Sequence, residues 1–309
     1  MLKSSRRLRL MELGVCGAVL LLASSTRIWA QGPRTAFNGG RAFEDLKHLV
    51  GYGPRPAGSV ALAEARRWML AQLKQTGAQV EEDSFTANTP LGAISMTNLI
   101  AKFPGTKSKV VMVAGHYDTK RFDNFRFVGA NDGGSSAALL LELARSLQGR
   151  KHDLTYWLVF FDGEEAVREQ WEGDDNTYGS RHLVEKLSSA GELGRVQALI
   201  LVDMIGDSHL VIPREANSTP WVTDLVFSAA HRLGYNREFP DSNGAVGDDH
   251  IPFVYAGVAA IDLIDFDPND GYWHTEKDKL DHCSPLSLTI VGRVVLAALA
   301  DLEKSPHIH

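Results

Sequence analysis

The chain has 309 residues, of which 44% are hydrophobic and 23% are charged, and its formal net charge at pH 7 is −6. This composition is typical of a globular protein and excludes a disordered or fibrous chain. The acidic excess argues against nucleic-acid binding, which needs a basic face to neutralise phosphates. Since Cys16 and Cys283 are the only cysteines, a fold held by several disulfides is excluded as well.

The first thirty residues have the order of a secretory signal peptide. Basic residues precede an apolar run from Leu13 to Ala23, and small and polar residues then lead to a cleavage position after Ala30. The sequence predicts a signal peptide over 1–30 and a single α/β domain over 31–309, exported to the periplasm or the medium. An uncleaved segment would instead anchor the protein in a membrane, although the run is short for a span. Residues 1–30 hold five basic residues and one acidic residue, so the remainder carries a formal charge of −10.

Helices and strands are predicted to alternate along the rest of the chain. Apolar residues at helical spacing indicate a short helix from Phe43 to Val50, and Ser59 is the expected cap of a helix that ends at Lys74. The remaining predicted elements are strands at 79–86, 93–103, 109–115, 155–161, 196–203 and 258–264, and helices at 134–148, 179–189, 219–233 and 284–303.

The fold class follows from the strand patterns and the connections. Residues 110–114, 157–161 and 198–202 are continuously apolar, which is typical of strands covered on both faces. Long connections that contain helices favour parallel crossovers, whereas the short loop within 79–103 favours an antiparallel hairpin at the sheet edge. We therefore expect an α/β fold with a mixed, mostly parallel central sheet flanked by helices.

Carboxylates and imidazoles lie where the predicted strands end. In an open α/β sheet, ligands bind outside the carboxyl ends of the strands, so residues from five separate segments are expected to meet at one edge. In chain order they are His116, Asp132, Glu164, Glu165, Asp203 and His274.

Taken singly, several of these residues have a simpler interpretation. Asp132 before two glycines is typical of a helix cap, and His274 of a surface histidine. The adjacent Glu164 and Glu165 are typical of a solvated pair. Asp203 differs, because a carboxylate that follows a run of apolar residues needs a partner or a metal. Together the set indicates a divalent ion, zinc above all, with one glutamate as ligand and its neighbour as general base.

Three further stretches resemble animal-type glutaminyl-peptide cyclotransferases (glutaminyl cyclases), within the zinc-dependent aminopeptidase superfamily. They are the segment 161–183, Asp248-Asp249-His250-Ile251-Pro252-Phe253 and Trp273-His274-Thr275. The resemblance runs from about residue 109 to 300. It implies a zinc aminopeptidase-like, or phosphorylase-hydrolase-like, sandwich. It also implies an enzyme that converts N-terminal glutaminyl residues of peptides and proteins to pyroglutamate and releases ammonia.

The resemblance further implies one zinc ion per chain and a role for each of eight residues. They are the zinc ligands Asp132, Glu165 and His274, the general acid/base Glu164, the hydrogen-bonded acidic pair Asp203 and Asp248 near the substrate, and the pocket-wall indoles Trp171 and Trp273.

The rim of the expected pocket departs from the animal pattern. Trp171 lies one residue further from Glu165 than in the animal enzymes. The loop 265–272 is one residue longer than theirs and carries Asp265, Asp267 and Asp270. An acidic rim favours peptides with a positive amino terminus or with basic residues beyond it.

Two other functions fit parts of the pattern. A secreted aminopeptidase with two zinc ions would use His116 and Asp203 for the second ion, and a non-catalytic envelope binding domain would keep only the fold. Trp171, the segment 248–253 and Trp273 favour the cyclase. If cleavage follows Ala30, the new first residue is Gln31, itself a candidate for cyclisation.

Overall fold

The structure is a computed structural model, and it describes residues 37–269 and 271–308. The predicted signal segment 1–30, Gln31 and Asp270 lie outside the described residues.

A six-stranded sheet forms the centre of the described chain, in the order β1-β2-β4-β3-β5-β8. β1 pairs antiparallel with β2 and β2 antiparallel with β4, while the other three pairings are parallel. The predicted mixed, mostly parallel sheet and its antiparallel edge hairpin are therefore confirmed. The strands are β1 (Gln79–Thr89), β2 (Gly92–Phe103), β3 (Val110–His116), β4 (Thr155–Phe161), β5 (Val196–Asp203) and β8 (Ala260–Ile264).

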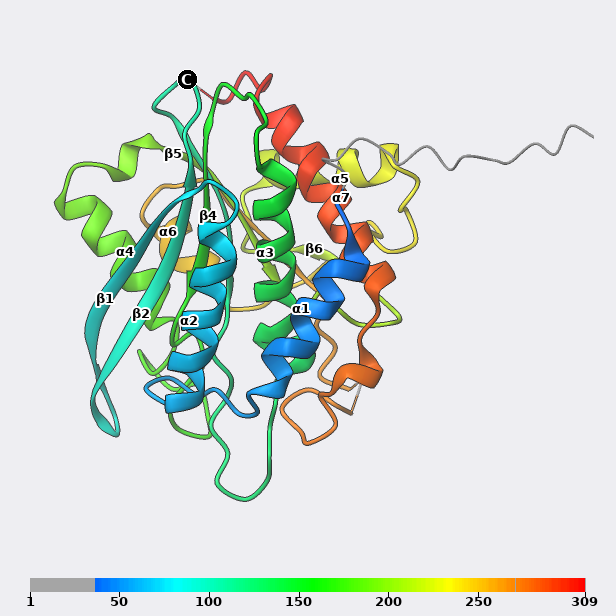
Figure 1. Cartoon of the computed structure of the whole chain (residues 1–309). Coiled ribbons are helices and arrows are strands. Elements are labelled where there is room, and N and C mark those ends of the chain that lie inside the picture. The colour runs from blue at the N-terminus through cyan, green and yellow to red at the C-terminus, as the bar shows by residue number, and fades with distance from the viewer. Residues whose placement is uncertain (1–36, 270, 309) are drawn as a thin grey trace, which may run out of the picture. The chain divides into compact units, whose positions relative to one another are not determined.

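Helices cover both faces of this sheet (Figure 1). The helices α1, α2, α3, α5 and α7 pack on one face, and α4 and α6 pack on the other. Val111 of β3 contributes to the first core and Met112 to the second, because neighbouring residues of a strand point to opposite faces. The helices are α1 (Gly39–Gly51), α2 (Val60–Lys74), α3 (Ser136–Leu147), α4 (Tyr178–Ser189), α5 (Pro220–Arg232), α6 (His250–Tyr255) and α7 (Pro285–Leu302).

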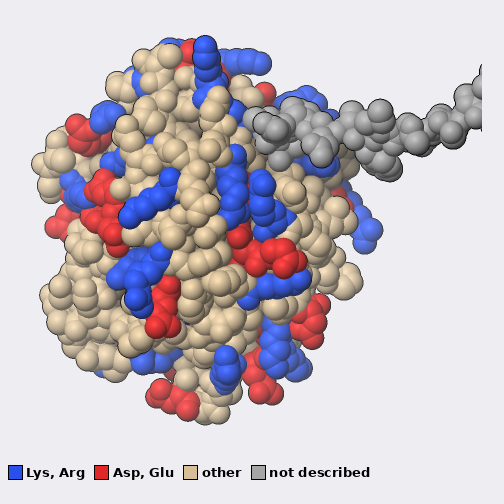
Figure 2. All heavy atoms as spheres, viewed as in Figure 1, with Lys and Arg blue, Asp and Glu red and all other residues tan. Residues whose placement is uncertain are grey.

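This two-sided cover explains the continuously apolar strands. Every residue of β3 and β4 is buried, as is every residue of β5 except Gln197. α7 is also apolar, with a mean hydropathy of 1.7, and by length and composition alone it could cross a membrane. It packs instead against α1 and α5, as the core helix of a globular fold does. On the face that α1, α2 and α3 cover, basic and acidic side chains are intermixed (Figure 2).

Several elements differ from the prediction. α1 begins at Gly39, four residues earlier than expected, because the Asn38 side chain caps it by accepting from Arg41 N. The sequence pattern also misses α6 and the two-residue strands β6 (Arg214–Glu215) and β7 (Asn243–Gly244). These pieces are too short to show a periodicity.

Candidate metal centre

The ends of three neighbouring parallel strands bring the candidate residues to one edge of the sheet. His116 is the last residue of β3 and Asp203 the last of β5, while Glu164 and Glu165 follow β4 directly after a turn. All four residues are buried. The adjacent glutamates are therefore not a solvated surface pair.

Asp132, Glu165 and His274 form the first of two acid–imidazole groups. His274 Nε2 lies 3.0 Å from Glu165 Oε1 and 3.3 Å from Asp132 Oδ2. One ligand atom from each residue falls within 4.8 Å of the other two. The His274 side chain is only 16% exposed, so the interpretation as an ordinary surface histidine is wrong.

The turn η1 (Ala130–Ser135) aims Asp132 into this group. Asp132 has non-helical backbone angles, and Gly133 has a φ of 73°, which favours glycine. A Cβ at position 133 would also meet the His116 ring and the Asp118 carbonyl. The residue that precedes α3 is Ser135, and Asp132 makes no capping hydrogen bond. The helix-cap interpretation of Asp132 is therefore wrong, because Asp132 lies within η1, four residues before α3 begins at Ser136.

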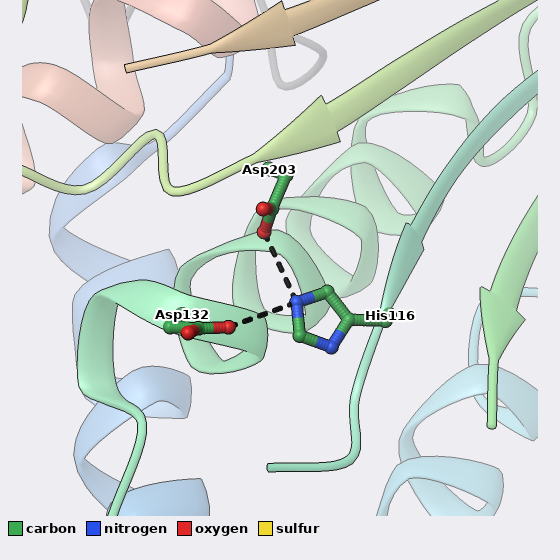
Figure 3. A group of neighbouring side chains, drawn as sticks. All are labelled: His116, Asp132 and Asp203. Carbon is green, nitrogen blue, oxygen red and sulfur yellow. Dashed lines mark hydrogen bonds and ion pairs between the residues drawn. The ribbon is translucent and has the colours of Figure 1, made fainter. Parts of the chain in front are cut away.

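The second group joins His116 to two carboxylates (Figure 3). His116 Nε2 lies 3.2 Å from Asp132 Oδ1 and 3.1 Å from Asp203 Oδ1. Asp203 Oδ1 also accepts a hydrogen bond of 2.8 Å from Met204 N. This confirms that Asp203, at the end of its apolar strand, has a partner. The two groups share Asp132.

Burial and neighbouring charges shift the protonation of these residues. Burial lowers the pKa of His274, but the carboxylates of Glu165 and Asp132 outweigh it and raise that pKa to about 10. Burial raises the pKa of Glu164 well above its usual range; the positive charge of His116 opposes this rise, and the carboxylate of Glu165 adds to it. The carboxylates therefore favour a positive charge on His274, and burial makes Glu164 a stronger proton acceptor than an exposed glutamate.

The first group fits a zinc ion. Glu165 Oε2 is buried and accepts no hydrogen bond from the described residues, and Lys120 Nζ lies 3.7 Å from it. Two carboxylates and an imidazole are donors that zinc accepts. His274 has a φ of 53°, a left-handed conformation that costs a non-glycine residue about 1–3 kcal/mol. The surrounding fold therefore holds this imidazole in place against backbone strain.

A pocket of about 490 Å³ opens beside the metal group. All eight residues to which the resemblance gives a role line it, together with Phe122, Glu169, Gln170, Met204, Val246, Gly247, Ile264 and Phe266.

The two indoles and the acidic pair in the pocket differ in how many contacts they make with the rest of the protein. Trp273 stacks on His274, with ring centroids 4.1 Å apart, and meets Phe266 edge-on. Trp171 lies at the mouth and is 37% exposed. In the described part of the chain no direct hydrogen bond joins Asp203 to Asp248, and Asp248 Oδ2 has no hydrogen-bond partner.

Three further buried acids lie near the centre, and none of them was predicted to have a role. Asp118 accepts from the backbone N–H groups of Glu164 and Glu165, at 3.2 and 3.4 Å. Asp278 holds the backbone of η1, and Asp262 lies within β8 with both carboxylate oxygens lacking a hydrogen bond. Asp262 could have been found, since it interrupts an apolar run as conspicuously as Asp203 ends one.

Comparison with known proteins identifies the family. Residues 98–299 match the model of peptidase family M28. The chain belongs to peptidase family M28. A glutaminyl-peptide cyclotransferase-like protein from Bos taurus is 34% identical over 281 residues, which cover 80% of this M28 chain and 72% of that protein.

Solved structures agree with this assignment. The glutaminyl cyclase of an Acidobacteriales bacterium matches with a TM-score of 0.84 and 40% identity, over 89% of this chain and 98% of that one. A Zn-dependent exopeptidase from Parabacteroides distasonis matches with a TM-score of 0.78 and 26% identity. The match covers 86% of this chain and 99% of that one. Within family M28 the chain belongs with the glutaminyl-peptide cyclotransferases. The resemblance and the zinc aminopeptidase-like fold are thereby confirmed.

Proposed function

We propose that this chain is a zinc-dependent glutaminyl-peptide cyclotransferase, which converts N-terminal glutaminyl residues of peptides and proteins to pyroglutamate and releases ammonia. The observation that carries the proposal is the convergence of all eight residues on one pocket. They come from separate segments of the sequence, and the resemblance to the cyclotransferases implies a role for each of them.

Asp132, Glu165 and His274 would hold one zinc ion per chain. When bound, zinc supplies a Lewis acid that polarises the γ-carboxamide of the substrate. Buried carboxylates and a pre-placed imidazole suit this task, because little rearrangement is needed to surround a cation.

Glu164 is the proposed general acid/base. The substrate α-amine forms a bond to its own γ-carboxamide carbon, and the bond from that carbon to the amide nitrogen breaks. Glu164 accepts a proton from the amine and returns one to the departing nitrogen, which leaves as ammonia. Burial raises the Glu164 pKa, so this carboxyl group holds the transferred proton more readily than an exposed glutamate would.

The acidic pair and the indoles would orient the substrate. Asp203 and Asp248 line the pocket with Glu164, where they can accept hydrogen bonds from the amine and the departing nitrogen. Burial raises the pKa of Asp248 well above its usual range, and the carboxylate of Asp262 adds to the rise. Trp171 and Trp273 would hold the glutaminyl side chain folded back on its amine and exclude water.

The direct test uses purified, zinc-loaded protein and a fluorogenic peptide that begins with glutamine. We expect stoichiometric pyroglutamate and ammonia. The same peptide with an acetylated amine lacks the nucleophile and serves as the control, for which no ammonia should appear. Release of a free amino acid without a cyclised product would contradict the proposal.

The second candidate is a two-zinc aminopeptidase, and the group of His116, Asp132 and Asp203 is the observation that favours it. Metal analysis separates the two functions. One tightly bound zinc ion per chain is expected for the cyclase, and two are expected for the peptidase.

We also propose that residues 1–30 are a signal peptide and that 31–309 is an exported catalytic domain, anchored to a membrane only if the segment stays uncleaved. The order of basic, apolar and small residues supports this. The substrates would then be peptides and proteins outside the cytoplasm.

A further inference from the structure

The side chain of Asn131, next to the proposed ligand Asp132, connects three loops around the metal centre. Asn131 is fully buried. Its Nδ2 donates a hydrogen bond of 3.0 Å to Tyr272 Oη, and its Oδ1 accepts one of 2.7 Å from Gly206 N. One amide group thus bonds to two other segments of the chain.

Tyr272 closes the connection between those two segments. Its hydroxyl donates a hydrogen bond of 2.6 Å to Asp207 Oδ2, and Asp207 is the residue after Gly206. Tyr272 is 4% exposed. The three loops are therefore tied pairwise by hydrogen bonds, and the two bonds that Asn131 makes are fully buried.

Each of these loops carries a residue of the proposed site. Asn131 precedes Asp132, Tyr272 lies two residues before His274, and Gly206 lies three residues after Asp203. Asn131 and Tyr272 are 141 residues apart in the sequence, so local backbone geometry cannot fix the distance between Asp132 and His274.

Hydrogen bonds from backbone N–H groups to side chains also connect these loops. Asp278, four residues after His274, accepts hydrogen bonds of 2.7 and 3.1 Å from the N–H groups of Asn131 and Asp132. Ser135 Oγ accepts one of 3.1 Å from Ile205 N. The Asn131 and Tyr272 side chains are thus part of a larger clamp on η1, and they are the part that mutation can test with least change of volume.

We propose that Asn131 and Tyr272 are positioning residues for the metal, which hold Asp132 and His274 at ligand distance from one another. This inference rests on the zinc site of the proposed function. A metal site tolerates ligand displacements of only about 0.2 Å, and residues that orient ligands typically contribute about ten- to hundred-fold in metal affinity or activity.

The decisive variant is Tyr272→Phe, which removes one hydroxyl and keeps the ring. We expect its zinc dissociation constant, measured by competition with a chromophoric chelator, to rise about ten- to hundred-fold. We also expect kcat to fall more than KM changes, because the pocket walls remain. Tyr255→Phe is the matched control, since Tyr255 is 85% exposed and its hydroxyl makes no hydrogen bond in the described structure; it should bind zinc as the wild type does.

Asn131→Ala and the double variant test whether the two residues act through their shared bond. The loss of zinc affinity in the double variant should be smaller than the product of the two single losses, since both substitutions break the same bond. Independent, multiplicative losses would overturn the shared role. If Asn131→Ala does not fold, Tyr272→Phe alone still decides.

A purely structural role would have a different signature. A lowered Tm with an unchanged zinc dissociation constant in folded Tyr272→Phe would overturn the proposal. Because chelator competition needs no substrate, this failure is distinct from that of the proposed function. Wild-type protein that binds zinc but forms no pyroglutamate would contradict the function and leave the positioning role standing.

Discussion

Glu164 is the residue on which the proposed chemistry depends most directly. Glu164→Gln keeps the volume of the side chain and removes its ability to exchange a proton. We expect turnover to fall by about 10²- to 10⁴-fold, while zinc stays bound because Glu164 is not a proposed ligand. Rate measurements with metal analysis on the same sample check both parts. The control is the same change at the neighbouring ligand, Glu165→Gln, which should lose zinc. Full activity in Glu164→Gln would contradict the proposed role of Glu164 as general acid/base.

Glu169 offers a residue-scale test of specificity. It lines the pocket mouth, is exposed, and makes no hydrogen bond or ion pair in the described structure. We expect peptides that begin Gln-Lys to have a higher kcat/KM than those that begin Gln-Glu, and Glu169→Lys to reverse the preference. Exposed charge pairs contribute up to about 1 kcal/mol, or about five-fold.

The control for Glu169→Lys is Glu185→Lys, an equal change of charge on the exposed side of α4. It should leave the preference intact, and raising the salt concentration should weaken the preference in every protein because exposed charges are screened. A preference that Glu169→Lys leaves unchanged would show that another group reads the second residue.

The sequence predicts those site residues whose chemistry stands out from their surroundings. Asp203 was recognisable because a carboxylate ends an apolar run, and the same argument applies to Asp262 within β8. Asn131 and Tyr272 carry no such signal. Their importance lies in a hydrogen bond between loops 141 residues apart, which only the folded chain creates.

At the scale of elements, the strands that are buried on both faces were the ones that the sequence pattern predicted best. β3, β4 and β5 are covered on both faces, so their apolar runs mark them as strands. The segment between β5 and β8 is different, because α6, β6 and β7 are too short to show a periodicity of their own. β6 and β7 pair with each other through backbone hydrogen bonds. Glu215 of β6 bonds to the His250 side chain and to the backbone N–H of Val246. It therefore anchors the chain both two residues before and two residues after Asp248.

This anchoring predicts a pH-dependent stability. Burial by itself raises the pKa of Glu215, but hydrogen bonds with His250 and with backbone N–H groups outweigh it and lower the pKa to about 2. The ionised form therefore stabilises the fold above the unfolded-state pKa of 4.5, by about 3 kcal/mol at pH 7. The contribution declines below pH 4.5 and is lost as the pH falls through 2.

Glu215→Gln tests this in denaturant unfolding of the metal-free protein, so that loss of zinc at low pH does not contribute. The variant should be less stable than the wild type at pH 7, and the difference should shrink by about half at pH 3. Glu185→Gln, on the exposed face of α4, should be neutral at both values. A difference that does not change with pH would mean that packing, not ionisation, explains the effect.

At the scale of the whole molecule, the charge balance hides how the acids are distributed. The formal charge of −10 after residue 30 suggests an ordinary acidic surface. Six carboxylates, however, are buried at or beside the pocket: Asp132, Glu164, Glu165, Asp203, Asp248 and Asp249. Composition could not show this, because it carries no information on which residues the sheet edge brings together.

Cleavage of the proposed signal peptide would link the processing of this chain to its proposed activity. If the signal peptide is removed after Ala30, the first residue is Gln31, a glutaminyl amino terminus of the kind that the proposed reaction consumes. We expect mass spectrometry of the exported wild type to show a peptide that begins at position 31 and has lost ammonia.

The Glu164→Gln protein, exported and purified in parallel, should retain mostly unmodified Gln31, which separates enzymatic from spontaneous cyclisation. Addition of wild-type enzyme to that variant should complete the conversion. A wild-type chain that keeps an unmodified Gln31 would argue against self-processing, and a terminus at another position would argue against the cleavage site.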